Sequence, residues 1–306
     1  MTTLVFGHKS PDTDATLSAI IWAWYLTNHR GEAAEPRLLG EPNTEAAFVL
    51  KHWGFAKPAI ISDVVAGQGV VIVDTNNPAE LPPAINDANI MAIIDHHMLV
   101  GGLKTKTPIN IVMRPLACTA TVMHDIMGDD VATLPREIKG AMLSCILSDT
   151  LEFRSPTTTP HDKAVAEKLA ADLGLSIPDY AAQMFAAKSD VSAFSDAELL
   201  RMDSKEYTID GKELRVSVLE TTAPKVVLDR KASLMAAMPG VARDDGADQV
   251  LLFVVDILKE EATLLVPNDL VKRIAQASFP CTVTGDTVVL PGIMSRKKQI
   301  IPALKM

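Results

Sequence analysis

Residues 90–97 read Ile-Met-Ala-Ile-Ile-Asp-His-His, a mainly apolar run that ends in an acid and two imidazoles. A second apolar run, Val70–Val73, ends in Asp74. Short apolar runs of this kind are typical of strands that are buried on both faces of a parallel sheet. The two runs therefore predict a mostly parallel sheet whose strands carry polar side chains where they end.

A third polar segment follows the first predicted strand, Thr3–Phe6, and reads Gly7-His8-Lys9-Ser10-Pro11-Asp12-Thr13-Asp14. The carboxyl ends of parallel strands meet at one edge of an open α/β sheet, where ligands bind. The three segments should therefore bring their polar side chains together. The side chains expected at this edge are those of His8, Asp12, Asp14, Asp74, Asp95, His96 and His97.

Carboxylates and imidazoles are ligands for divalent metal ions. A mixed set suits Mn²⁺ or Co²⁺ better than an all-oxygen Mg²⁺ shell, and the absence of cysteine from the set argues against structural zinc. The set is too large for one ion and about right for two. Two ions roughly 3.5–4 Å apart can stabilise both the attacking and the leaving oxygen of an in-line displacement. These segments predict a two-metal hydrolase.

Each segment also has a simpler explanation when it is taken alone. Asp12 or Asp14 can cap the helix that follows, and Asp74 can open a turn. The histidine pair is harder to explain as a structural feature. Because adjacent residues do not easily bind one ion, we expect one histidine of the pair to be a ligand and the other to act on the substrate or a proton. The conjunction of three strand ends favours the metal site.

Length and composition set wider limits. A chain of 306 residues is expected to form two domains. The net charge of −9 argues against nonspecific nucleic-acid binding, although Arg296-Lys297-Lys298 form a compact basic cluster. Three widely spaced cysteines and no visible secretory signal at the N-terminus favour a reducing compartment, so we expect a cytoplasmic protein without a membrane partner.

Residues 1–188 alternate between strand-like and helix-like patterns. Strands are expected at Thr3–Phe6, Pro58–Ser62, Val70–Asp74 and Ile90–Asp95. Helices are expected after the first strand, where Leu17, Ile20, Ile21 and Trp24 share a buried face, and at Thr119–Met127, Pro135–Asp149 and His161–Leu173. The pattern predicts an α/β domain with a mostly parallel sheet flanked by helices.

The pattern changes at residues 189–195, which we interpret as a linker or hinge. Residues 196–306 predict a smaller, mixed α+β domain, and Asp210-Gly211 between Tyr207–Ile209 and Leu214–Val218 is a strong hairpin signal. Further strands are expected at Val250–Leu258, Ala262–Val266, Thr282–Val283 and Thr287–Leu290, and helices at Asp196–Met202, Lys231–Met238 and Leu270–Ala277.

Four motifs together resemble the DHH phosphoesterase superfamily, and more narrowly the manganese-dependent family II inorganic pyrophosphatases. They are His8–Asp14, Asp95-His96-His97, Leu147-Ser148-Asp149-Thr150 and Ser295-Arg296-Lys297-Lys298-Gln299. The last motif is the most specific, because other DHH enzymes carry a Gly-Gly-His motif that this chain lacks. The resemblance spans nearly the whole chain. Ser10 departs from it, since the family usually has Asn there, but this position is not a ligand.

The resemblance implies two Mn²⁺ ions per active site, with Co²⁺ possible and further Mg²⁺ or Mn²⁺ arriving with the substrate. It implies six metal ligands: His8 and Asp12 for the first ion, Asp14, His96 and Asp149 for the second, and Asp74 as a bridge between them. His97 would be catalytic and face the substrate. Lys205, Arg296 and Lys297 would hold the phosphates across a cleft between the catalytic domain and a substrate-binding domain.

The activity implied is hydrolysis of inorganic pyrophosphate to two phosphates by in-line attack of a hydroxide that bridges the metals. A homodimer is implied as well. The closest alternatives are an exopolyphosphatase and a DHH phosphodiesterase that acts on short oligonucleotides, although aromatic residues for base stacking are only 5% of the chain. A regulatory binding module is a rival from another class. Such modules carry an inserted nucleotide-binding region, for which there is no room between Pro58 and Val70.

Overall fold

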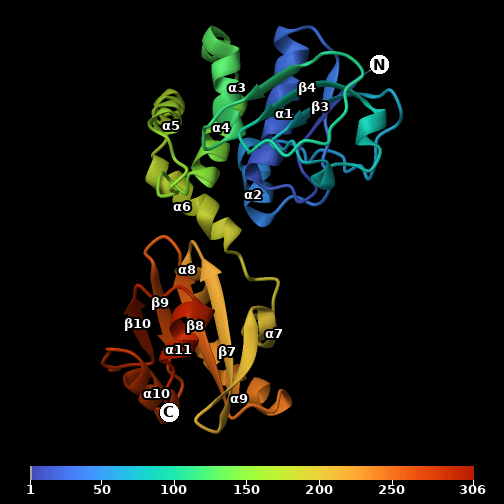
Figure 1. The fold of residues 1–306 in the computed structure, drawn as a ribbon. Helices are drawn as coiled ribbons and strands as arrows, with labels where there is room; N and C mark the ends of the chain where they lie inside the picture. Colours follow the sequence, from blue (N-terminus) through green and yellow to red (C-terminus); the bar gives the residue numbers. More distant parts are fainter. Residues whose placement is uncertain (1) are drawn as a thin grey trace. The chain divides into compact units, whose positions relative to one another are not determined.

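The computed structural model describes residues 2–306, and the contacts within the chain divide it into two compact units (Figure 1). Unit 1 ends at Lys188, and unit 2 comprises Ser189–Met306. Residues 189–195 form neither helix nor strand. Each unit has its own sheet, of five strands in the described residues. Within residues 2–306, no helix combines the length and the apolar character needed to cross a membrane.

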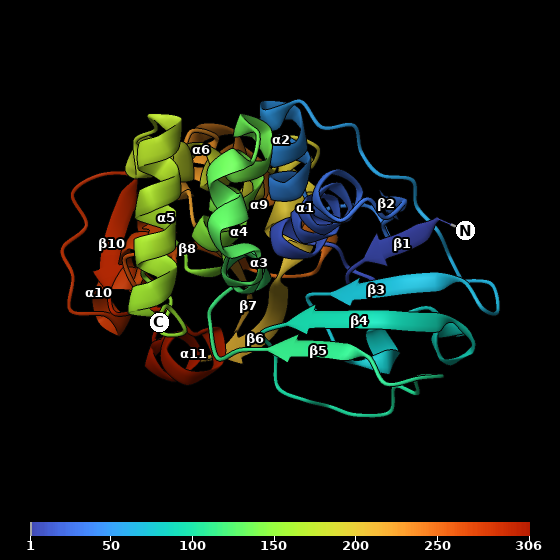
Figure 2. The same ribbon diagram turned by 90° about the horizontal axis from the view of Figure 1, so that it is seen from above.

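The sheet of unit 1 is parallel throughout, with the strand order β2-β1-β3-β4-β5 (Figure 2). Its strands are β1 (Thr3–Phe6), β2 (Ala34–Pro36), β3 (Gly69–Val73), β4 (Asn89–Asp95) and β5 (Asn110–Met113). The strand order reverses between β1 and β3, so the segments that follow these strands diverge. In open α/β sheets the crevice at such a reversal is where ligands bind.

Six helices belong to unit 1 in the described residues. They are α1 (Thr13–His29), α2 (Thr44–Trp53), α3 (Thr119–Met127), α4 (Arg136–Asp149), α5 (Pro160–Leu173) and α6 (Ile177–Lys188), with short 3₁₀ turns η1 (Pro78–Glu80), η2 (Ile85–Asp87) and η3 (Gly128–Thr133). Helix α1 is buried on nearly all sides, including its first turn. The close approach of α2 to α4 requires Gly140, because a Cβ there would lie 2.3 Å from the Trp53 ring.

Unit 2 is a mixed sheet with the order β10-β9-β8-β7-β6, in which only the β7–β8 pair is parallel among the described strands. The strands are β6 (Ser204–Ile209), β7 (Lys212–Thr221), β8 (Gln249–Asp256), β9 (Glu261–Leu265) and β10 (Thr287–Pro291). The helices are α7 (Asp196–Met202), α8 (Pro224–Leu228), α9 (Lys231–Asp244), α10 (Asp269–Ser278) and α11 (Ile301–Ala303), preceded by a π-helical turn, η4 (Arg296–Ile300). Strand β8 is buried along its whole length, because α10 covers one face of the sheet and α7 and α9 cover the other.

The fold class predicted from the sequence is confirmed, but four details are wrong. Pro58–Ser62 is not a strand: Pro58 has no N–H to donate, and Ile60 makes a single isolated bridge to Leu38. Thr282–Val283 is not a strand either. Trp24 is only half-buried, since α1 buries Trp22 and Tyr25 instead.

The fourth error is the end of the helix expected at Lys231–Met238. Helix α9 continues through Pro239 to Asp244. Proline removes one backbone hydrogen bond from a helix interior, which is the reason to expect a stop there. The next turn buries Val241 and Ala242 against β8 and its neighbours, and this burial favours continuation of the helix.

Candidate metal centre

Asp74 lies at the centre of the site, directly after β3. Its backbone is in the left-handed region with φ 58, a conformation that aspartate tolerates better than most residues and that often marks a functional position. The side chain is 2% exposed. Its Oδ2 lies 3.5 Å from His8 Nε2, and its Oδ1 lies 3.4 Å from His96 Nε2. One buried carboxylate thus faces two imidazoles, one with each oxygen.

The potential ligand atoms converge in three overlapping groups, and the atoms within each group lie within 4.8 Å of one another. The groups are His8, Asp12 and Asp74; Asp14, His96 and Asp149; and Asp74, His96 and His97. The structure therefore brings together all six residues that were predicted as ligands. They come from the segments after β1, β3 and β4 and from the end of α4.

The acids of the α1 turn are fixed by hydrogen bonds. Asp12 Oδ1 accepts from the Ala15 amide at 3.0 Å, so the capping role considered from the sequence is real, and Asp12 still belongs to the first group. Asp14 accepts from Ser18 Oγ at 2.8 Å and from the Thr119 amide at 2.7 Å. The Thr119 hydroxyl donates to Asp74 Oδ1 at 3.0 Å. The first turns of α1 and α3 thus hold the carboxylates in place.

The two histidines of the pair have different surroundings. His96 is 16% exposed, and its Nδ1 lies 3.0 Å from the Leu116 carbonyl oxygen, which directs Nε2 toward Asp74 and, at 4.0 Å, toward Asp149 Oδ2. His97 is 53% exposed, and its Nδ1 lies 2.8 Å from Asp95 Oδ1. A neutral or charged imidazole held in this way presents Nε2 to a ligand. The expected division between a ligand and a substrate-facing histidine stays a prediction, because both lie near Asp74.

Asp95 is a residue whose role the sequence reasoning missed. It is fully buried, and its Oδ1 also accepts from the amides of His96 at 2.8 Å and His97 at 3.1 Å. Its Oδ2 accepts from Asn76 Nδ2 at 2.6 Å. Asp95 therefore orients the histidine pair rather than joining the donor groups. A buried acid that ends an apolar strand directly before two histidines was the available signal.

The nearby carboxylates raise the pKa values of the His8 and His96 imidazoles. Burial alone would lower the pKa of His8, but its contacts with Asp12 and Asp74 outweigh burial and raise it to about 10. Burial would also lower the pKa of His96, but its contact with Asp74 and the charge of Asp14 outweigh burial and raise it to about 9. The carboxylates thus hold positive charge at the two positions that face Asp74.

The pKa values of the carboxylates are shifted as well, because these groups are buried close to one another and to the imidazoles. Burial and the charge of Asp74 raise the pKa of Asp14 to about 6, and burial with the charges of Asp14 and Asp74 raises the pKa of Asp149 well above its usual value. The pKa of Asp74 is lowered, because its imidazole contacts outweigh burial. Asp149 Oδ2 is buried without a hydrogen-bond partner in the described part of the chain. Divalent cations would neutralise the charge of these crowded acids and would give the buried Asp149 oxygen a partner.

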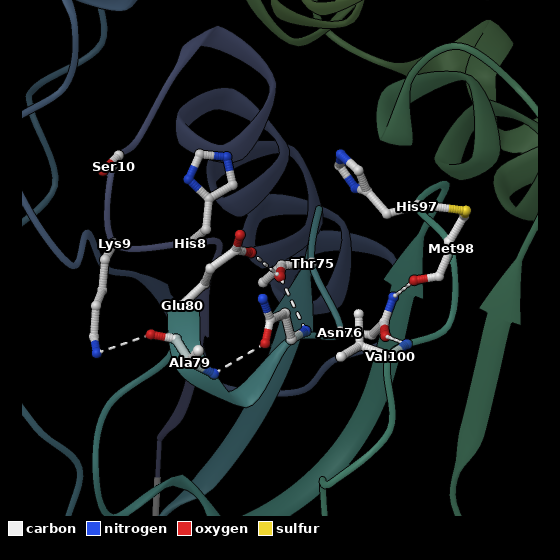
Figure 3. A pocket seen from close by; sticks show the side chains of 11 residues that line it. His8, Lys9, Ser10, Thr75, Asn76, Ala79, Glu80, His97, Met98 and Val100 are labelled. Atoms are coloured by element: carbon white, nitrogen blue, oxygen red, sulfur yellow. Dashed lines mark hydrogen bonds between the residues drawn. The ribbon is translucent and has the colours of Figure 1, made fainter.

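Two pockets open at the donor groups. One of about 170 Å³ is lined by Asp12, Asp74, His96, His97, Ala117, Asp149 and Thr157. A larger one of about 580 Å³ lies beside it (Figure 3), and in this view His8 and His97 stand on opposite sides. Glu80 also lines the larger pocket and accepts from Thr75 Oγ1 at 2.7 Å. His97 lines both pockets, so it is placed to contact a ligand in either.

The predicted phosphate contacts lie in unit 2. Arg296 and Lys297 line a pocket of about 440 Å³ together with Asp203. Arg296 is 11% exposed. It forms an ion pair with Asp203 Oδ1 at 2.7 Å and donates to the Asp203 carbonyl oxygen at 2.8 Å. Lys297 is exposed. Lys205, on β6, is exposed and is not among the residues that line this pocket.

A parallel sheet with clustered acids and histidines at its strand ends, joined to a second α+β unit, defines a metal-binding protein of the DHH class. Residues 2–148 match the DHH family, N-terminal domain, and residues 182–306 match the DHHA2 domain. The chain belongs to the manganese-dependent, or family II, inorganic pyrophosphatases. The family expected from the motifs is confirmed.

The relatives span nearly the whole chain. The chain is 34% identical to the manganese-dependent inorganic pyrophosphatase of Bacillus subtilis, covering 98% of this chain and 97% of the relative. It is 38% identical to a probable manganese-dependent inorganic pyrophosphatase of Deinococcus radiodurans, with the same coverage.

Solved structures agree. A putative family II inorganic pyrophosphatase of Methanococcus jannaschii has a TM-score of 0.61 at 32% identity, over 99% of this chain and 98% of the other. An exopolyphosphatase-related protein of Bacteroides fragilis has a TM-score of 0.51 at 11% identity, covering 98% of this chain and 89% of the other. The second likeness is one of fold alone.

Proposed function

We propose that this chain hydrolyses inorganic pyrophosphate to two phosphates. The observation that carries the proposal is the position of Asp74, whose two oxygens face His8 and His96, one from each of the first two donor groups. A carboxylate placed in this way can bind two neighbouring metal ions, one with each oxygen. The names of the relatives in Bacillus subtilis and Deinococcus radiodurans supply the substrate.

The donor set suits two Mn²⁺ ions, and Co²⁺ would also suit it. We assign His8 and Asp12 to the first ion, Asp14, His96 and Asp149 to the second, and Asp74 to both. Bound there, two divalent ions would activate the attacking water and neutralise charge on the phosphoryl oxygens. Further Mg²⁺ or Mn²⁺ would arrive with the pyrophosphate, whose own charge binds such ions.

His97 is the proposed catalytic side chain. The hydrogen bond with Asp95 raises the pKa of His97 despite its partial burial, which favours the protonated form of the imidazole. With Nδ1 turned to Asp95, the proton on Nε2 is directed away from that carboxylate. From there it can be donated to the leaving phosphate or can hydrogen-bond it, which is general acid assistance.

We assign substrate binding to unit 2, through Lys205, Arg296 and Lys297. Residues 1–188 would be the catalytic domain, 196–306 the substrate-binding domain and 189–195 the hinge. The support is chemical: a polyanion needs cationic contacts, and an acidic chain with a net charge of −9 concentrates three consecutive cations at residues 296–298. Arg296 must exchange its contact with Asp203, at least in part, for one with phosphate.

We further propose a cytoplasmic homodimer. All three cysteines are free, and two are buried, which suits a reducing compartment. Strand β5 is an edge strand whose Ile111 is 54% exposed, and its Val112 lines a groove of about 500 Å³ together with Met91. An exposed apolar edge invites a second copy. Sedimentation of the wild type and of Ile111→Lys would test this, since only the variant should be monomeric.

The test of the proposed activity is phosphate release with Mn²⁺ from pyrophosphate, tripolyphosphate, long polyphosphate and a short oligonucleotide. We expect pyrophosphate to be cleaved far faster than the polymers, and activity to vanish when a chelator removes the metal. Comparable rates on long polyphosphate would overturn the proposal and favour an exopolyphosphatase. Cleavage of the oligonucleotide alone would favour a phosphodiesterase.

A further inference from the structure

Glu45 is a buried carboxylate that lies outside the donor groups of the metal centre. It belongs to the first turn of α2 and is fully buried. Its Oε2 accepts from Thr13 Oγ1 at 2.8 Å and from Ser148 Oγ at 2.6 Å, and lies 3.4 Å from Lys188 Nζ. Removing a carboxylate from water is strongly unfavourable unless its partners compensate. A group that is so costly to bury usually has a specific task.

The two hydroxyls that donate to Glu45 lie next to predicted metal ligands. Thr13 stands between Asp12 and Asp14, and Ser148 directly precedes Asp149. Both hydroxyl-bearing side chains are buried. Through one oxygen, Glu45 thus joins the first turn of α1 to the last turn of α4. These are segments that the second donor group must bring together.

The third partner of Glu45 lies where the chain leaves unit 1. Lys188 is the last residue of α6 and of unit 1, and its carbonyl oxygen accepts from Thr44 Oγ1 at 3.4 Å. Within the described residues, Lys188 is the only cation paired with Glu45. The Lys188 side chain is 38% exposed, so its charge is partly screened and it can move more easily than the hydroxyls.

We propose that Glu45 is a positioning residue for the metal centre and that Lys188 couples this centre to the end of unit 1. Glu45 holds the α1 turn and the α4 end at the separation that two ions require. Displacement of Lys188 would leave a buried charge without its counterion and would loosen both contacts. The inference rests on the metal binding assigned in the proposed function, but its tests measure Mn²⁺ binding and not cleavage of pyrophosphate.

The first test is Mn²⁺ binding, measured by calorimetry and by the electron paramagnetic resonance of bound Mn²⁺. Loss of a group that orients metal ligands typically costs about 10- to 100-fold in affinity or activity. We expect Glu45→Gln, Thr13→Val and Ser148→Ala each to weaken Mn²⁺ binding within that range and to broaden the spectrum. The matched control is Asp256→Asn, which removes another buried carboxylate, in unit 2, and should leave Mn²⁺ affinity unchanged.

The second test concerns Lys188. We expect Lys188→Met to weaken Mn²⁺ binding as well, and Glu45→Gln combined with Lys188→Met to be no worse than Glu45→Gln alone, because the pair is then removed together. Additive effects of the two substitutions would show that Lys188 does not act through Glu45.

The outcomes separate this inference from the proposed function. Wild-type Mn²⁺ affinity and an unchanged spectrum in Glu45→Gln and Ser148→Ala would overturn the inference, whatever the activity. Weakened Mn²⁺ binding in these variants would support it even if wild-type protein did not cleave pyrophosphate. If Glu45→Gln fails to fold by circular dichroism, the two hydroxyl deletions, which keep the carboxylate, decide the question.

Discussion

The metal centre of unit 1 and the basic turn of unit 2, which comprises Arg296, Lys297 and Lys298, are built in opposite ways. Asp14 and Asp74 are nearly inaccessible to solvent, and hydrogen bonds from two helices fix them. Lys297 is exposed, and Arg296 is held mainly by Asp203. A small cation needs donors at fixed positions, because each displacement of a ligand atom costs affinity. A polyanion tolerates more adjustable contacts, which form as it binds.

The largest effect should follow from Asp74→Asn. Asp74 belongs to two of the three donor groups, and we assign it to both ions. The substitution removes its negative charge, so neither ion would keep its full ligand set. We expect Mn²⁺ content to fall at both positions and pyrophosphate hydrolysis to drop to background. Metal analysis of the dialysed protein and a phosphate assay measure these effects. Full metal content with near-normal turnover would refute the two-metal assignment.

Substitutions in the histidine pair test whether His96 binds metal while His97 does not. His97→Gln should keep Mn²⁺ and slow turnover by about 10²–10⁴-fold, the usual contribution of general acid–base assistance. His96→Gln should lose Mn²⁺, because His96 Nε2 faces two carboxylates. Binding titrations and kcat for the two variants decide the matter. Equal loss of metal in both would mean that the roles cannot be divided in this way.

The basic turn should behave differently from the metal centre. Arg296→Ala should leave Mn²⁺ binding intact and lower kcat/KM by about 10²–10³-fold, the scale for losing one preorganised donor to developing charge. Lys272→Ala, which removes an exposed cation of α10 that does not line this pocket, serves as a control for net charge alone. Loss of metal from Arg296→Ala would erase the distinction between the two regions, and equal effects of both substitutions would reduce the turn to a general electrostatic attraction.

The smallest expected effect is the pH dependence of Mn²⁺ binding. With pKa values of about 10 and 9, His8 and His96 are protonated at pH 7 and must become neutral to bind metal. Apparent Mn²⁺ affinity should therefore rise with pH below these values, by up to about tenfold per pH unit for each proton released. Calorimetry in buffers of different ionisation enthalpy should show release of at least two protons at pH 7, because Asp149, whose pKa is also raised, can add to the two from the imidazoles. Binding without proton release would show that the imidazoles are not ligands.

The sequence predicted the fold class because the signals are local. Apolar runs such as Val70–Val73 predict buried strands wherever they occur, and Asp210-Gly211 sets a hairpin by its backbone preferences. The errors arose where tertiary packing overrides local preference. Pro58–Ser62 is apolar enough for a strand but lies outside the sheet, and α9 passes through a proline because its next turn is buried.

The residues of the candidate site could be named from motifs, but their environments could not. Asp149 carries no local signal beyond closing a helix, and only the family resemblance singled it out. Its unpartnered oxygen follows from the packing of α4 beside α1. Glu45 escaped notice, and Asp95 was named without its orienting role, for a related reason. Their partners include backbone amides, hydroxyls, a side-chain amide and a lysine, which form no recognisable pattern along the chain.

By itself, the sequence determined which chemical groups are present and that strand ends carry them, because the alternation of elements and the family motifs are properties of the chain. Only the tertiary structure decided how those groups meet. The approach of His8 and His96 to opposite oxygens of Asp74 depends on the strand order β1-β3-β4 and on the left-handed backbone of Asp74. Distances between side chains far apart in sequence are set by packing, and the pKa values follow from those distances.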